Sequence, residues 1–168
     1  MAELEPALAA LQMAIQTEID GRNFYSQFAR QTQDDEARAM FERLAQDEVK
    51  HLEILEAAKE TLETKGTWTE YAGMEPAAVP GAPIFSRERV EQNIMEYASD
   101  LSALRMAYLI ERDAVDFYQR ALGQTEDPRG KQMFQDLMRM EQGHLDLLQG
   151  EYEFLRGQFQ LSMGFSPF

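Results

Sequence analysis

Two Glu-x-x-His motifs are the residues of this sequence best suited to chemistry. Glu48 and His51 form the first, Glu141 and His144 form the second, and the chain contains only these two histidines. Residues three apart on a helix lie on one face, so each motif directs a carboxylate and an imidazole towards one point. That pair suits a metal ion. One motif alone would be weak evidence, but two copies that use every histidine favour a metal site.

The motifs belong to an internal repeat with a single offset of 93 residues, the separation of the two histidines. The offset maps residues 8–55 onto residues 101–148 without a gap, and it maps Glu18 onto Glu111. Other matching positions are Leu8/Leu101, Leu11/Leu104, Met13/Met106, Tyr25/Tyr118, Phe41/Phe134 and Leu55/Leu148. Two copies are too few for a solenoid, so the sequence predicts two related helical hairpins in a closed bundle.

Four segments have the periodicity of helices and would carry these side chains. Apolar residues recur at helical spacing from Pro6 to about Thr32, from Asp34 to about Lys65, from about Ser99 to Leu122 and from Asp127 to Leu155. Residues 65–98 contain many turn-forming residues and predict a long crossover, with a short extra helix at 87–97. The expected fold is all-α: a four-helix bundle of two antiparallel hairpins joined by a crossover, in one domain over residues 1–168.

The four glutamates fall at one level of this bundle. Glu18 lies fifteen residues before the turn near Gln33 and Glu48 lies fifteen after it. At 1.5 Å per residue both are about 22 Å from that turn. Glu111 and Glu141 repeat the spacing around the second turn. All four carboxylates and both imidazoles are therefore predicted to meet in one layer, where a cation would offset their mutual repulsion.

Four carboxylates and two imidazoles are a donor set for two metal ions. One glutamate from each of two helices and one Glu-x-x-His from each of the other two is the arrangement of carboxylate-bridged di-iron bundles. Oxygen-rich sites with one imidazole per metal suit iron, with manganese or zinc as substitutes. Gly21 and Ala114, each three residues after its glutamate, leave space beside the metals.

The composition argues against several other classes of protein. Thirty acidic and sixteen basic residues give a net charge of −14, whereas nucleic-acid binding requires basic patches. The sequence has no cysteine, which excludes disulfides, Cys-ligated zinc and a rubredoxin-type iron site from it. Glu3 and Glu5 stand where a signal peptide has basic residues, and no apolar run reaches transmembrane length. We expect a cytoplasmic protein that binds neither nucleic acid nor membrane.

The ligand pattern resembles the di-iron signature of the ferritin-like superfamily, and the hairpin spacing is most similar to the rubrerythrin group. The resemblance covers residues 4–161 and rests on Glu18, Glu48-x-x-His51, Glu111 and Glu141-x-x-His144. It implies a ferritin-like four-helix bundle, usually dimeric, with a non-haem di-iron centre that reacts with peroxide or oxygen. The same six residues would then be the catalytic ones, because they hold the reacting metals.

The resemblance also bears on Tyr25 and Tyr118, which lie two turns after Glu18 and Glu111. Comparable tyrosines in rubrerythrin-like proteins hydrogen-bond ligand carboxylates and orient them. The alternative is that both are amphipathic tyrosines of the core. The sequence leaves these two interpretations open.

Two features depart from the rubrerythrin pattern. Typical rubrerythrins carry a C-terminal rubredoxin domain, for which this sequence has no cysteine, so the electron donor would be a separate protein. They also carry an extra glutamate one turn after the third-helix ligand, where this chain has Ala114. The symmetric ligand set is similar to that of bacterioferritin. There a haem-ligating Met follows the first Glu of the motif, but here that residue is Val49, so no haem is expected.

Three functions remain open from the sequence. The first is a di-iron oxidoreductase that reduces hydrogen peroxide or oxygen with electrons from a separate donor. The second is a ferroxidase for iron handling or storage, and the third is a metal-stabilised structural bundle without turnover. A homodimer is expected, and Phe165 and Phe168 are candidates either for packing on a second subunit or for fraying.

Overall fold

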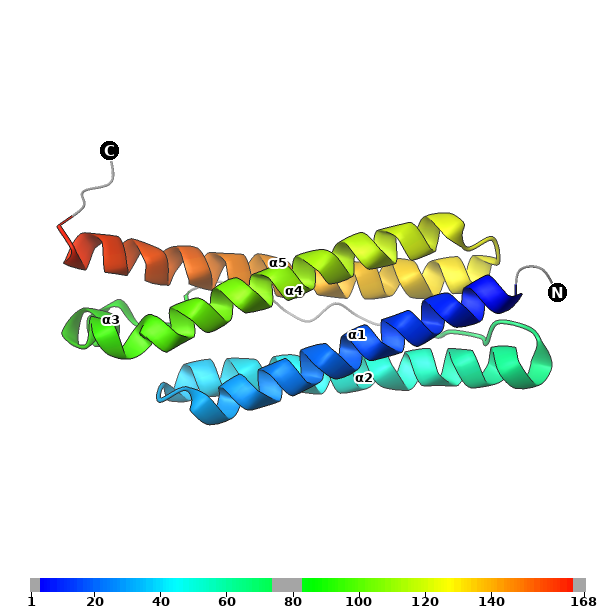
Figure 1. Cartoon of the computed structure of the whole chain (residues 1–168), viewed down its shortest axis with the longest axis horizontal. Coiled ribbons are helices and arrows are strands. Elements are labelled where there is room, and N and C mark those ends of the chain that lie inside the picture. The colour runs from blue at the N-terminus through cyan, green and yellow to red at the C-terminus, as the bar shows by residue number, and fades with distance from the viewer. Residues whose placement is uncertain (1–3, 74–82, 165–168) are drawn as a thin grey trace.

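Four long helices make up the protein in this computed structural model. They are α1 (Leu4–Gln31), α2 (Asp35–Lys65), α4 (Ala98–Gln124) and α5 (Pro128–Ser162), and the connection between α2 and α4 contains α3 (Arg87–Gln92) and the 3₁₀ helix η1 (Ile94–Tyr97) (Figure 1). The structure describes residues 4–73 and 83–164, so Phe165, Phe168 and part of the crossover lie outside it. Regular structure within those ranges is entirely helical, which confirms the predicted all-α bundle.

The helix ends follow capping signals in the sequence. Asp34 accepts hydrogen bonds from two backbone N–H groups in the first turn of α2. That helix ends at Lys65 and is followed by the C-cap Gly66, whose φ of 66° lies in the left-handed region that favours glycine. Asp127 caps α5, and Pro128 occupies its first position. None of the described helices combines the length and the apolar composition that crossing a membrane requires.

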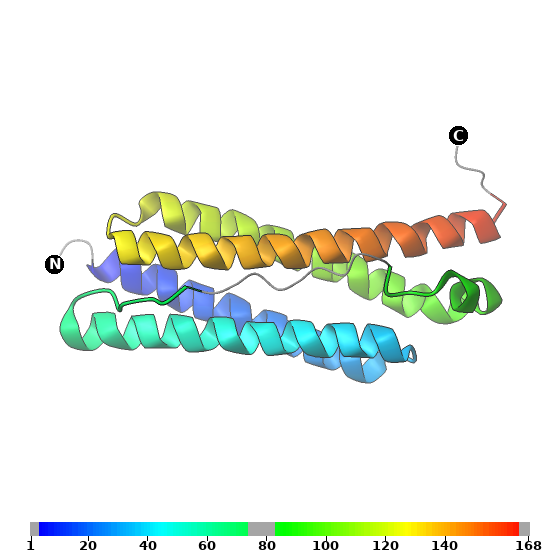
Figure 2. The ribbon, with the colours of Figure 1, turned by 180° about the vertical axis from the view of Figure 1, so that it is seen from behind.

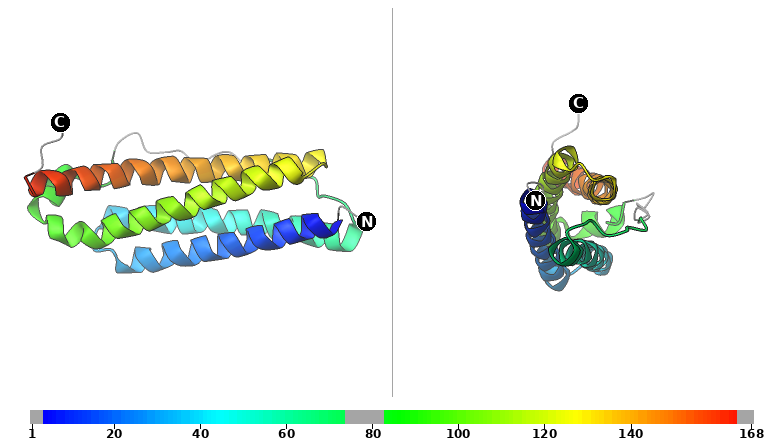
Figure 3. Two further views of the ribbon diagram at one scale, coloured as in Figure 1. Left: turned by 45° about the horizontal axis from the view of Figure 1, so that its top comes forward. Right: turned by 90° about the vertical axis from the view of Figure 1, so that its right-hand side faces the viewer.

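The long helices form two antiparallel hairpins, α1/α2 and α4/α5, which contact each other mainly through α1 and α4. Figure 3 shows the two hairpins along the bundle and from one end. Small buried residues occupy the facing helices: Ala14 on α1, and Ala107 and Ala114 on α4. Contacts between the hairpins are reciprocal, because Tyr25 of α1 donates to Glu111 of α4 and Tyr118 of α4 donates to Glu18 of α1, as a pseudo-twofold axis between the hairpins requires.

The described parts of the connection from α2 to α4 lie on the opposite side of the bundle, against α2 and α5 (Figure 2). Trp68 is buried and contacts the ring of Phe134 edge-on at 5.8 Å between centroids. Further along, Glu151 of α5 accepts hydrogen bonds from the backbone N–H groups of Ile84 and Phe85, at 2.8 and 3.4 Å. These contacts anchor the described parts of the connection to the bundle.

The hydrophobic core consists of two clusters, one on each side of the glutamate and histidine layer. One contains Phe41 and Leu148, and the other contains Phe134 and Leu55, which the repeat relates to them. The pseudo-twofold axis therefore passes through the layer itself. Packed apolar residues on both sides hold the backbone that positions the polar side chains.

Candidate metal centre

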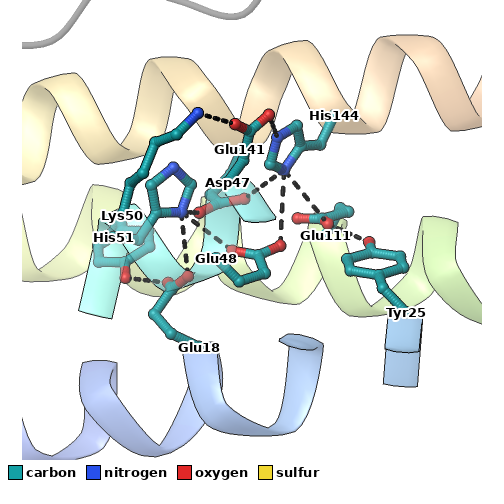
Figure 4. A network of polar contacts seen from close by, with 10 residues as sticks. Glu18, Tyr25, Asp47, Glu48, Lys50, His51, Glu111, Glu141 and His144 are labelled. Atoms are coloured by element: carbon teal, nitrogen blue, oxygen red, sulfur yellow. Dashed lines mark hydrogen bonds and ion pairs between the residues drawn. The ribbon is translucent and has the colours of Figure 1, made fainter. Parts of the chain in front are cut away.

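The structure brings all six predicted ligand side chains together in the middle of the bundle. Glu18 comes from α1, Glu48 and His51 from α2, Glu111 from α4, and Glu141 and His144 from α5 (Figure 4). None of the six residues is more than 3% exposed. Their atoms define two positions for a metal ion, within each of which the donor atoms lie within 4.8 Å of one another. We call these the His51 position and the His144 position.

Glu48 and Glu141 face both positions. Glu48 Oε2 lies 3.0 Å from His51 Nδ1, and its Oε1 lies 3.6 Å from His144 Nδ1. Glu141 Oε1 lies 2.8 Å from His51 Nδ1, and its Oε2 lies 3.1 Å from His144 Nδ1. Each carboxylate thus offers one oxygen to each position, which is the geometry of a bridging ligand.

Glu18 and Glu111 each face one position, and each is held by a tyrosine of the other hairpin. Glu18 Oε2 lies 3.0 Å and Glu111 Oε1 lies 3.5 Å from the Nδ1 of the nearer histidine. The hydroxyl of Tyr118 donates to Glu18, and that of Tyr25 donates to Glu111. Both tyrosines are fully buried. The two hydrogen bonds link α1 to α4 and fix the orientation of the carboxylates.

The buried charges change one another's pKa. Burial and the other three carboxylates raise the pKa of Glu48 well above its usual range. Burial, and then Glu141, raise the pKa of Glu111 from 4.5 to about 8. Burial disfavours the charged form of His51 and of His144, but the carboxylates around them raise both pKa values well above 6.5. Burial also opposes ionisation of Glu141, but the two imidazoles lower its pKa. Without a metal, protons therefore offset the excess negative charge.

The ligand atoms are better placed to bind a cation than to hydrogen-bond one another. His51 Nδ1 lies within 3.0 Å of three carboxylate oxygens, although one N–H can donate fully to only one of them. Glu141 Oε1 is buried and 2.8 Å from that nitrogen, yet it makes no hydrogen bond among the described residues. A metal ion at each position would satisfy these oxygens together. Carboxylates with one imidazole per ion suit iron or manganese.

Asp47 belongs to the site, although the sequence analysis did not select it. It is buried, and its Oδ2 lies 3.5 Å from His144 Nε2, while its Oδ1 lies 2.6 Å from Lys50 Nζ. Burial acts against its ionisation, but His144 and Lys50 lower its pKa to about 2. A carboxylate at the outer nitrogen favours the ring orientation that turns Nδ1 towards the metal position. Neither His144 Nε2 nor His51 Nε2 makes a hydrogen bond within the described residues, so the contact of Asp47 with His144 is an ion pair, and the repeat replaces Asp47 with Met140.

A family model described as Rubrerythrin matches residues 9–152, which include all six residues of the candidate centre. No curated protein and no solved structure matched the chain.

Proposed function

The chain belongs to the rubrerythrin family, and we propose that it is a non-haem di-iron oxidoreductase that reduces hydrogen peroxide or oxygen. The observation that carries this proposal is the pair of carboxylates, Glu48 and Glu141, that face both metal positions. Shared ligands would hold two ions as neighbours, as transfer of two electrons to one small molecule requires. The proposed metal is iron, with no haem.

The six ligand residues would hold the metals in a buried, preorganised site. Bound iron would supply the two electrons that, with two protons, reduce hydrogen peroxide to two molecules of water. Tyr25 and Tyr118 keep the outer carboxylates in place through their hydrogen bonds. Asp47 orients the imidazole of His144. The apolar clusters above and below the layer restrict the access of water.

A separate protein is the proposed source of electrons. The sequence contains no cysteine, so these residues cannot hold the thiolate-ligated iron that delivers electrons in typical rubrerythrins. With a net charge of −14, the chain would attract a donor with a basic docking surface, and that association would weaken as salt rises.

A ferroxidase is the second candidate, and the symmetry of the ligands favours it. Ala114 stands where the resemblance leads us to expect an additional glutamate, so the six ligands form three pairs related by the repeat. Particle size helps to distinguish the two functions. An oxidoreductase is expected as a homodimer, whereas iron storage requires a closed shell of many subunits.

A comparison of the rates at which hydrogen peroxide and oxygen oxidise the bound Fe(II) tests the proposal. The protein is loaded anaerobically with Fe(II), mixed with hydrogen peroxide or oxygen, and followed by the near-ultraviolet absorbance of the ferric product. Faster oxidation by peroxide, with iron consumption that stops near two ions per chain, supports the peroxidase. Oxidation by oxygen with continued consumption of Fe(II) supports the ferroxidase. If neither oxidant reacts with the bound Fe(II), the metal site has a structural role only.

Two matched variants control this experiment. Glu141→Gln removes a carboxylate that faces both positions and should abolish the fast phase. Glu56→Gln changes an exposed glutamate on α2 and should leave the rate unchanged. A fast phase that survives Glu141→Gln would show that the reaction occurs elsewhere.

A further inference from the structure

The repeat relates the two ends of the bundle, but the two ends are closed differently (Figure 1). At one end, α3 and η1 bring Arg89 and Tyr97 to Asp34, in the turn between α1 and α2. At the other end, α1 begins beside the turn between α4 and α5, and a pocket of about 340 Å³ lies between them. A pocket of this size can hold one small organic molecule.

Small side chains create the pocket. Three aromatic residues at the closed end have smaller counterparts that line the pocket, and the offset of 93 residues pairs them as Phe28/Ala121, Tyr97/Leu4 and Phe159/Gly66. The three aromatic residues pack in one apolar cluster. The pocket therefore corresponds to space that aromatic rings fill at the closed end.

Trp68 forms a buried wall of the pocket. Its indole packs directly on α5 at Gly130, where an added Cβ would lie 2.7 Å from the ring. Leu62 and Ala121 also line the pocket and are buried. An aromatic ring bound in the pocket would thus lie against apolar side chains, one of them aromatic.

The aspartates that cap α2 and α5 indicate which polar group the pocket can bind. Asp34 Oδ1 accepts from the first turn of α2, and its Oδ2 lies 3.5 Å from Arg89 Nη1 and accepts a hydrogen bond of 3.0 Å from the Tyr97 hydroxyl. Asp127 repeats the first two contacts, because its Oδ1 accepts from the backbone of Arg129 and its Oδ2 lies 2.8 Å from Arg129 Nη2. Among the described residues, nothing takes the place of the Tyr97 hydroxyl at Asp127. Asp127 lines the pocket, so a bound hydroxyl can donate to it.

We propose that this pocket is a binding site for a small neutral phenol, with its ring against Trp68 and Ala121 and its hydroxyl donating to Asp127 Oδ2. Residues at the carboxyl ends of α2 and α4 line the pocket, so the negative ends of two helix dipoles lie beside it. Glu126 and Asp127 add negative charge to the lining. The site therefore disfavours anions.

The probe is p-cresol, which is the tyrosine side chain without its backbone, and toluene is the same molecule without the hydroxyl. Trp68 is the only tryptophan, so its indole N–H gives one cross-peak in the proton–nitrogen correlation spectrum of the full, metal-free chain. Titration with p-cresol should shift that cross-peak saturably. Its affinity should exceed that of toluene about tenfold, because its hydroxyl donates to a charged acceptor. The anion p-toluate should bind more weakly than toluene.

Three variants separate the apolar wall from the polar contact. Ala121→Phe supplies the side chain that Phe28 has at the closed end and should abolish binding of both molecules. Its control is Gly123→Ala, an exposed position with nothing within 4 Å of an added Cβ, which should leave both affinities unchanged. Asp127→Ser keeps an oxygen to cap α5 but removes Oδ2. It should reduce the affinity for p-cresol to that for toluene, and unchanged toluene binding shows that the pocket is intact.

Several results would overturn the site. These are the absence of a saturable shift with p-cresol, a shift that persists in Ala121→Phe, and tighter binding of p-toluate than of p-cresol. Equal affinities for p-cresol and toluene in the unaltered protein would overturn the hydrogen bond to Asp127. Because these titrations use metal-free protein, their results are independent of the proposed oxidoreductase activity.

Discussion

Removing the metals should leave a protein that becomes less stable as the pH rises from about 5 to about 8. Chelation leaves four buried carboxylates with only two imidazoles and bound protons to offset them. Burial raises the pKa values of Glu48 and Glu111, so the folded protein holds protons that the unfolded chain has already released. Ionising these groups in the folded state then costs stability.

The pKa of Glu111 sets the size of this loss of stability. Its pKa rises from 4.5 to about 8 on folding. Its contribution to the free energy of unfolding therefore falls by up to ~1.4 kcal/mol for each unit by which the pH rises. That amounts to roughly 4 kcal/mol between pH 5 and pH 8. The raised pKa values of His51 and His144 act in the same direction above 6.5, because their stabilisation is lost as the pH rises. Folding lowers the pKa values of Glu141 and Asp47. Their ionised forms therefore stabilise the fold at pH values above the pKa values of the unfolded chain, and this stabilisation is lost only in acid.

Urea unfolding of the metal-free protein, followed by circular dichroism at about pH 5, 6.5 and 8, measures this dependence. Glu111→Gln should flatten the decline, whereas the exposed Glu56→Gln should not. The metal-loaded protein should show the opposite trend, because the ligands bind metal in their deprotonated forms. Metal-free stability that stays level or rises over this range would show that the buried carboxylates do not hold extra protons in the folded state.

Other substitutions test the surroundings of the site and the packing of the bundle. Tyr25→Phe and Tyr118→Phe should each weaken Fe(II) binding by about 10–100-fold in competition with a chelator, because each releases a ligand carboxylate. Asp47→Asn should weaken only one of the two metal positions, which makes the titration biphasic. Gly130→Ala should lower the free energy of unfolding by about 1–3 kcal/mol, since an added Cβ would lie 2.7 Å from neighbouring side chains. Gly123→Ala is its control, because nothing lies within 4 Å there.

Each of these substitutions has an outcome that contradicts its basis. Unchanged affinity in both tyrosine variants would mean that the hydrogen bonds do not orient the ligands. Equal weakening of both metal positions by Asp47→Asn would remove the link between this carboxylate and His144. An unfolding midpoint for Gly130→Ala as high as that for Gly123→Ala, in thermal melts, would show that the neighbouring side chains relax freely.

The helices and the layer of glutamates and histidines were predictable because local and periodic signals agree. Asp34 and Gly66 mark the two ends of α2 at the residues where the structure places them. The repeat placed Glu18, Glu48 and the related residues at one level, since equal spacing from a turn gives equal height in an antiparallel hairpin. These inferences need only distances along the chain.

Features that depend on how the hairpins meet were not predictable in the same way. Helical periodicity places Tyr25 near Glu18 on α1, but its hydroxyl donates to Glu111 of the other hairpin. Asp47 was not predictable from the repeat, because the repeat pairs it with Met140 and only residues of matching type stand out in such a pattern. The extra helical segment at 87–97 divides into α3 and η1 at Asn93, whose φ of −140° interrupts the helix.

The two metal positions should bind two Fe(II) ions per chain, and an anaerobic Fe(II) titration of the metal-free protein measures that number. We expect an end point of two ions per chain, because the structure offers two positions that share Glu48 and Glu141. We also expect Glu141→Gln to weaken binding at both positions together. An end point of one ion or none, or full binding in Glu141→Gln, would contradict binding of two ions by shared ligands.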